Sequence, residues 1–169
     1  MSYEVTNEGT EDMPFFVGGH PGFKCPLDEG ESYDDYELRF EQREAAELCT
    51  AVPSTGLIDV EHRSKNPMIG QNLPLTHELF DFAETIFDVL ESHVVTLTKK
   101  TEDKGVRLTF PDMPYLIVWS KPEGDFVAVE PWGGLSPCSD EDDILEHKRG
   151  CLVAKPGETV TRGFEIEIL

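Results

Sequence analysis

The part of the sequence that says most about the architecture is Phe126-Val127-Ala128-Val129-Glu130-Pro131-Trp132-Gly133-Gly134. It begins as an apolar run typical of a strand and ends in Pro, Trp and two glycines. Side chains two residues apart share a face in an extended chain, so Glu130 lies on the same face as Ala128. Pro131 cannot donate a backbone hydrogen bond, so we expect the strand to end here. Burying a carboxylate at the end of such a strand face costs free energy, so we expect another group or a reaction to make use of it.

The second half of the chain continues this β-strand character. Short apolar segments are separated by turns that contain Gly, Pro, Asp and Glu. The predicted strands are Val94–Thr98, Val106–Phe110, Tyr115–Ser120, Phe126–Glu130, Cys151–Ala154 and Thr159–Leu169. Short strands at close spacing with such turns predict one all-β domain over residues 1–169, an antiparallel β-sandwich with short helical segments.

The N-terminal segment reads as two strands joined by a polar turn. Met1–Asn7 alternates in character, residues 7–12 are polar and contain a glycine, and Met13–Val17 is again extended. This pattern predicts a β-hairpin from Tyr3 to Val17.

The region that follows is less regular. Tyr36–Glu41 alternates as an exposed strand does, whereas Gln42–Cys49 is compatible with strand or helix by propensity. Gly56–Gly70 is mixed and is expected to be rich in loops. Apolar residues then recur at helical intervals, and we expect a short helix over Thr76–Phe80 with Thr76 as its N-cap.

Composition excludes several classes of partner. The chain has 34 acidic and 14 basic residues, a net charge of −20, and so acidic a surface repels nucleic acid and anionic membranes. No apolar run is long enough for a membrane helix, and the acidic N-terminus does not resemble a signal peptide. The four cysteines are widely spaced, which suits reduced thiols. We therefore expect a cytoplasmic protein with a neutral ligand.

Glu130 and His20 are the candidate acid–base residues. His20 follows two glycines and precedes Pro21, so it lies in a sharply shaped loop next to a predicted strand. An imidazole with an unperturbed pKa near ~6.5 donates a proton at neutral pH, and a carboxylate near ~4.3 accepts one. The simpler alternatives are a solvated strand end for Glu130 and an exposed turn for His20.

Other chemistries have weaker support. The histidines and cysteines lack the paired spacing of zinc ligands, and the acidic run 140–143 lacks the central Gly and terminal Glu of a calcium loop. There is no Gly-x-Ser-x-Gly motif and no phosphate-binding glycine loop. We therefore predict no metal site.

Several motifs, taken together and in order, resemble the aldose 1-epimerase (galactose mutarotase) family, in its LacX-like bacterial branch. The first is Gly18-Gly19-His20-Pro21-Gly22-Phe23-Lys24-Cys25-Pro26-Leu27. The others are Leu73–Phe80, Tyr115–Ser120, Phe126–Gly134 and the turn Lys155–Glu158. The similarity extends over nearly the whole chain.

The resemblance implies an antiparallel β-supersandwich that binds a hexose and interconverts its α and β anomers without a cofactor. It implies that His20 protonates the ring oxygen while Glu130 takes the proton of the C1 hydroxyl. Trp119 and Trp132 would form apolar walls for the sugar, unless they belong to the core.

The sequence departs from the family pattern in two places. Many relatives have an aspartate that helps hold the sugar where this chain has Ala83, so Glu84 or Asp81 is expected to substitute for it. The chain also corresponds to the C-terminal half of the family fold, which would leave sheet edges uncovered. A fragment, a homodimer that covers these edges and a smaller sandwich are the three alternatives.

The sequence is compatible with three functions. The first is an aldose 1-epimerase, complete or needing a partner chain. The second is a carbohydrate-binding β-sandwich without catalysis. The third is a glycosidase that uses Glu130 with Asp81 or Glu84, which requires two carboxyl groups about 5–9.5 Å apart.

Overall fold

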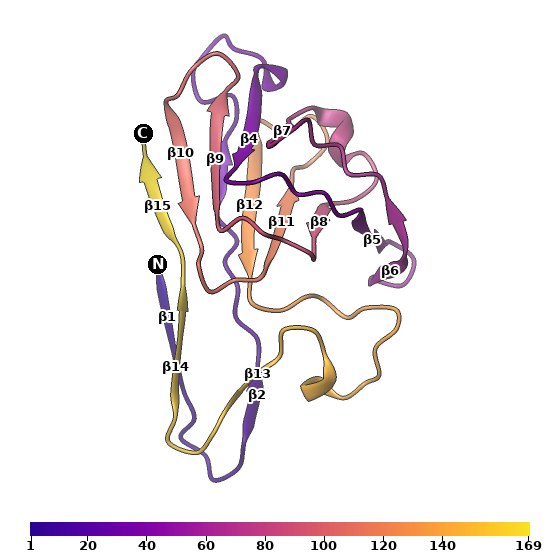
Figure 1. Ribbon diagram of the computed structural model, residues 1–169, viewed down its shortest axis with the longest axis vertical. Helices are drawn as coiled ribbons and strands as arrows, with labels where there is room; N and C mark the ends of the chain where they lie inside the picture. The colour runs from indigo at the N-terminus through magenta and orange to yellow at the C-terminus, as the bar shows by residue number, and fades with distance from the viewer.

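The computed structural model describes residues 1–169 and consists mainly of β-strands (Figure 1). The strands are β1 (Ser2–Thr6), β2 (Met13–Phe15), β3 (Gly22–Lys24), β4 (Tyr36–Phe40), β5 (Leu48–Val52), β6 (Leu57–Ser64), β7 (Asn72–Pro74), β8 (Thr85–Phe87), β9 (Val94–Lys99), β10 (Gly105–Thr109), β11 (Tyr115–Trp119), β12 (Phe126–Trp132), β13 (Leu152–Ala154), β14 (Thr159–Gly163) and β15 (Glu165–Ile168). The short 3₁₀ helices are η1 (Tyr33–Asp35), η2 (His77–Phe80) and η3 (Leu145–His147). No helix is long and apolar enough to pass through a membrane.

The strands form two large sheets and two ribbons. One sheet has the order β15-β10-β9-β4-β7, and the other has the order β3-β12-β11-β8-β5-β6. The pairs β1–β14 and β13–β2 form two-stranded ribbons that extend from one end of the sheets (Figure 1). Neighbouring strands pair antiparallel throughout. The predicted all-β antiparallel sandwich is confirmed.

The main hydrophobic core combines side chains from both large sheets. The buried apolar residues of one sheet include Leu38, Leu73, Val95, Leu97 and Leu108, and those of the other include Phe87, Leu116, Val118, Val127 and Val129. Burial of this apolar surface is the main source of stability in such a sandwich. It also fixes the register of each strand, because a slip by one residue would turn the apolar side chains to the wrong face.

Strand β12 shows how this register places a polar group. Val127 and Val129 point into the main core. The alternate residues Ala128, Glu130 and Trp132 therefore lie on the outer face of the six-stranded sheet. A second, smaller apolar cluster covers part of this outer face and consists of Cys49, Ile58, Ile86, Ile117, Leu135 and Cys138. Glu130 is buried on the outer face, not inside the sandwich.

Two predictions about the C-terminal strands are corrected. The strand does not end at Glu130, because β12 continues to Trp132. Pro131 lacks only a donor, and its carbonyl accepts a hydrogen bond of 2.8 Å from the Gly19 N–H. The predicted strand Thr159–Leu169 divides at Phe164 into β14 and β15.

The predicted hairpin from Tyr3 to Val17 is wrong. Strand β1 pairs with β14, and β2 pairs with β13. The segment between β1 and β2 is tied instead to the C-terminal part of the chain, because the buried Asn7 side chain donates a hydrogen bond to the Ala154 carbonyl. The same side chain donates a second bond to the Glu11 carbonyl within the segment. Alternation predicts which side chains share a face, but it does not identify the partner strand.

The region from residue 36 to residue 90 differs from the prediction in detail. Tyr36–Glu41 is not an exposed strand, because β4 lies between β9 and β7 and is largely buried. Gln42–Cys49 contains no helix, and Gly56–Gly70 holds the eight-residue strand β6. The short helix is confirmed as η2, with Thr76 at its N-cap position but without a side-chain capping bond.

Candidate functional site

His20 and Glu130 are in direct contact, although 110 positions separate them in the sequence. The distance between His20 Nε2 and Glu130 Oε1 is 3.1 Å. The His20 side chain is 64% exposed, whereas the Glu130 side chain is 3% exposed. We call these residues the His–Glu pair. It joins a buried carboxylate to an imidazole that solvent can reach.

Backbone hydrogen bonds on both sides of His20 hold its loop against β12. The Gly19 N–H donates to the Pro131 carbonyl at 2.8 Å, and the Val129 N–H donates to the Pro21 carbonyl at 3.1 Å. The bonded residues flank His20 in the loop, as Gly19 and Pro21, and flank Glu130 in β12, as Val129 and Pro131. The strand that carries the carboxylate therefore also fixes the position of the His20 loop. Catalytic sites depend on such positioning, since a misplacement of about 1 Å can strongly lower a rate.

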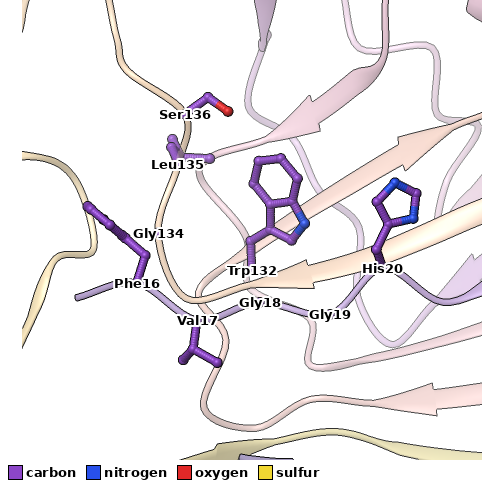
Figure 2. A pocket seen from close by; sticks show the side chains of 9 residues that line it. All are labelled: Phe16, Val17, Gly18, Gly19, His20, Trp132, Gly134, Leu135 and Ser136. Carbon is purple, nitrogen blue, oxygen red and sulfur yellow. The ribbon is translucent and has the colours of Figure 1, made fainter. Parts of the chain in front are cut away.

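A cleft of about 260 Å³ opens at the His–Glu pair. Its other lining residues are Glu84, Ile117, Trp119 and Trp132. Ile117 is paired directly with Glu130 across β11 and β12, and Trp119 follows it two residues later on the same face. Trp132 stands beside His20 with its indole nitrogen on the side of the histidine (Figure 2). The cleft is therefore lined by two tryptophan side chains and by the His–Glu pair.

The predicted substrate-binding residues separate into two groups. Trp119, Trp132 and Glu84 line the cleft, and Glu84 lies in the loop immediately before β8. Asp81 does not reach the cleft: it is exposed and caps the C-terminal end of η2. Ile117 was missed by the sequence reasoning, although the two-residue period from Trp119 along the predicted strand would have identified it.

The electrostatics of the cleft favour a basic carboxylate. Burial raises the pKa of Glu130 above its ordinary value, and the charge of Glu84 adds to the effect. The charge of His20 and the N–H of Trp132 act in the opposite direction, since both stabilise the ionised carboxylate. The net effect raises the pKa of Glu130, so its ionised carboxylate is a stronger base than that of a solvated glutamate.

The cysteines lie apart from this chemistry. All four are unpaired, and three of them are buried. Burial raises the pKa values of Cys25 and Cys49 to about 12, so both remain thiols at neutral pH. No group of three or more His, Cys, Asp or Glu side chains is arranged to hold a metal ion. The prediction that the site works without a cofactor stays a prediction.

Comparisons with known proteins identify the family of the chain. The family model described as aldose 1-epimerase matches residues 1–166. Protein LacX of Lactococcus lactis subsp. lactis, in its plasmid and chromosomal forms, is 40% identical over 169 residues, which is 99% of this chain and 56% of the relative. The chain thus spans little more than half the length of these relatives.

Solved structures show the same relationship. A galactose mutarotase-like protein from Lactobacillus casei ATCC 334 superposes with a TM-score of 0.83 at 30% identity, over 99% of this chain and 58% of that one. A galactose mutarotase related enzyme from Lactobacillus acidophilus gives a TM-score of 0.84 at 29% identity, over 99% and 56% of the two chains. The chain belongs to the aldose 1-epimerase family.

Proposed function

We propose that this chain interconverts the α and β anomers of a hexose by general acid–base ring opening. The observation that carries the proposal is the contact of 3.1 Å between His20 Nε2 and Glu130 Oε1 at the base of an aromatic cleft. The ring oxygen and the C1 hydroxyl oxygen of an aldose are bonded to the same carbon. An acid and a base that serve these two oxygens must therefore lie close together, as these two do.

The proposed reaction moves one proton at each oxygen. His20 Nε2 gives its proton to the ring oxygen, while Glu130 Oε1 takes the proton of the C1 hydroxyl. The bond between C1 and the ring oxygen breaks, and the electron pair left on the C1 oxygen forms the aldehyde carbonyl. The aldehyde rotates about the C1–C2 bond. Glu130 then returns its proton to the carbonyl oxygen as the ring closes on the other face, and His20 takes its proton back.

The rest of the cleft supports binding of a pyranose. The Trp119 and Trp132 rings are suitable surfaces for the apolar C–H face of a sugar. Trp119 is held nearly edge-on by Phe126, at 5.5 Å between ring centroids and 63° between planes. Glu84 lines the same cleft, and we assign its carboxylate to accept hydrogen bonds from sugar hydroxyls, in the role that an aspartate has in many relatives. No electron or group leaves the sugar, so the reaction as written requires no cofactor.

The test follows the relaxation of fresh α-D-glucose or α-D-galactose by polarimetry. We expect the protein to accelerate relaxation above the buffer rate and each of His20→Gln and Glu130→Gln to lower the enzymatic rate by about 10²–10⁴-fold. Glu4→Gln, on the exposed side of β1 and outside the residues that line the cleft, is the control for general effects of substitution. Equal relaxation by wild type and Glu130→Gln would refute the catalytic role.

A carbohydrate-binding protein without turnover, or a partial enzyme that needs a partner chain, is the second candidate. The observation in its favour is the 64% exposure of the His20 side chain, which leaves the acid open to water. Binding alone predicts that sugar changes the tryptophan fluorescence without any change in the relaxation rate. Adding a polypeptide made of the LacX residues outside the matched region separates the two cases, because only a partial enzyme would then gain activity.

A glycosidase is the third candidate, because Glu84 is a second carboxylate in the same cleft. It predicts release of nitrophenol from a nitrophenyl hexoside and its loss in Glu84→Gln. Mutarotation predicts no release, since the nitrophenyl group replaces the proton that Glu130 must remove.

A further inference from the structure

A second cavity, of about 440 Å³, adjoins the cleft. It shares His20 and Trp132 with the cleft and is completed chiefly by Phe16, Leu135 and Ser136. We propose that this cavity binds the second ring of a 1→6-linked reducing disaccharide whose reducing ring lies over the His–Glu pair. The proposal rests on the proposed function and identifies the substrate class of the same site.

Two glycines shape the cavity. A Cβ atom at Gly18 would lie 3.0 Å from Cδ1 of Trp132, and one at Gly134 would lie 2.0 Å from the Phe16 ring. The absence of these side chains lets both aromatic rings lie directly against the backbone. Trp132 then stands between His20 on one side and Leu135 and Ser136 on the other (Figure 2). The Trp132 indole therefore forms a wall of both the cleft and the second cavity.

The size of the two hollows indicates more than one ring. The cleft alone, at about 260 Å³, falls below the range of about 300–1,000 Å³ that is typical of drug-sized ligands. Together with the adjoining cavity of about 440 Å³, it falls within that range. A single pyranose would leave the second hollow filled with water.

The lining indicates the chemistry of the second group. Apart from His20, the side chains around the second cavity are apolar or aromatic, with the Ser136 hydroxyl as a polar group. A phosphate or carboxylate would find no cation there besides His20, in a chain with a net charge of −20. A neutral sugar ring fits, because its C–H face packs on aromatic rings and its hydroxyls hydrogen-bond to groups such as a serine.

The linkage follows from the orientation of the reducing ring. His20 lines both hollows, whereas Glu130 lines only the cleft. A third hollow also borders His20 but lacks Trp132. The Trp132 wall shared by the cleft and the second cavity therefore directs the ring oxygen that His20 protonates toward the second cavity. C5 is bonded to that oxygen and carries C6, so a substituent on O6 projects into the second cavity. A substituent on O4 leaves the ring from a carbon one bond further away from His20.

The experiment compares glucose with its two α-glucosyl derivatives, isomaltose (1→6) and maltose (1→4). Exchange between the α and β H1 signals in NMR measures kcat/KM at anomeric equilibrium for all three. We expect kcat/KM for isomaltose to exceed that for glucose by about tenfold, as one additional aromatic contact would give. Maltose should show no such gain.

Ser136→Trp fills the second cavity, and Ser54→Trp adds the same side chain in the exposed turn between β5 and β6. We expect Ser136→Trp to remove the isomaltose gain while glucose stays within about twofold. Ser54→Trp should change neither. Phe16→Ala, which removes one wall, should also reduce the gain.

The subsite is refuted if glucose is anomerised but isomaltose is no better, if maltose gains equally, or if Ser136→Trp lowers kcat/KM for both sugars alike. Failure with glucose itself would instead refute the proposed function.

Discussion

A methyl group at position 19 is a sharp perturbation of the loop that carries His20. A Cβ atom built on Gly19 would lie 2.3 Å from Cε1 of Phe164 and 2.9 and 3.0 Å from two other atoms of the same ring. Ordinary contact begins at 3.4 Å, so the two segments must separate by about 1.1 Å. Phe164 is 5% exposed and belongs to the main core. The loop therefore yields more easily than the ring, and His20 moves with it.

The magnitude of the effect follows from this displacement. A misplacement of about 1 Å at a reacting group lowers a rate by about 10²-fold. Gly19→Ala should therefore lower kcat/KM for anomerisation by about that factor. Overpacking against a buried ring should also lower the free energy of unfolding by about 1–3 kcal/mol. The two measurements are polarimetry with fresh α-D-glucose and unfolding in urea.

Gly22→Ala is the matched control on the other side of His20 and Pro21. A Cβ atom at Gly22 meets nothing within 4 Å, so this variant should retain wild-type rate and stability. Phe164→Leu, which removes the ring edge that the methyl group meets, should restore part of the activity lost in Gly19→Ala. Unchanged activity in Gly19→Ala, or an equal loss in Gly22→Ala, would refute this view of how His20 is positioned.

Three further outcomes are expected. The kcat/KM for anomerisation should fall toward acid pH with a midpoint above the ordinary carboxyl pKa of 4.5, because burial raises the pKa of Glu130 and protonation removes the base. A midpoint at or below 4.5 would contradict the burial argument. The same raised pKa means that stability contributed by Glu130 is lost as pH rises through it, so Glu130→Gln should melt at a higher temperature than wild type at neutral pH, and this gain should disappear as the pH is lowered. Asp88→Ala should lower the free energy of unfolding by about 2 kcal/mol in urea titrations, because Asp88 accepts hydrogen bonds of 2.8 and 2.7 Å from Arg63 and so joins the end of β8 to β6. An unchanged urea midpoint would contradict a stabilising role for this pair.

Local patterns in the sequence were sufficient for much of the second half of the fold. The strands after residue 90 have strong alternation and clear turns, so their positions follow from side-chain period and turn chemistry. The same reasoning placed Glu130 on a buried face of β12. The motif resemblance paired it with His20, and the structure shows the two in contact at 3.1 Å. Their catalytic roles remain predictions.

Long-range pairing was the part that local patterns did not contain. Ser2 pairs with Gly163 in the β1–β14 ribbon, and no turn between Tyr3 and Val17 could reveal this. Local patterns also could not predict the second cavity, because Phe16 and Ser136 lie far apart in the sequence and only the fold brings them together. Asp81 shows a related limit: it lies close to Glu84 in the sequence, but it is an exposed residue at the end of η2 and does not line the cleft.

The most direct test of the proposed mechanism is a double-mutant cycle on the His–Glu pair. The rate of glucose anomerisation is measured for wild type, His20→Gln, Glu130→Gln and the double variant. If the two groups act on adjacent oxygens in one transition state, each single variant loses about 10²–10⁴-fold and the double variant is little slower than the slower single variant. Losses that multiply in the double variant, or a Glu130→Gln protein that relaxes the sugar at the wild-type rate, would contradict it.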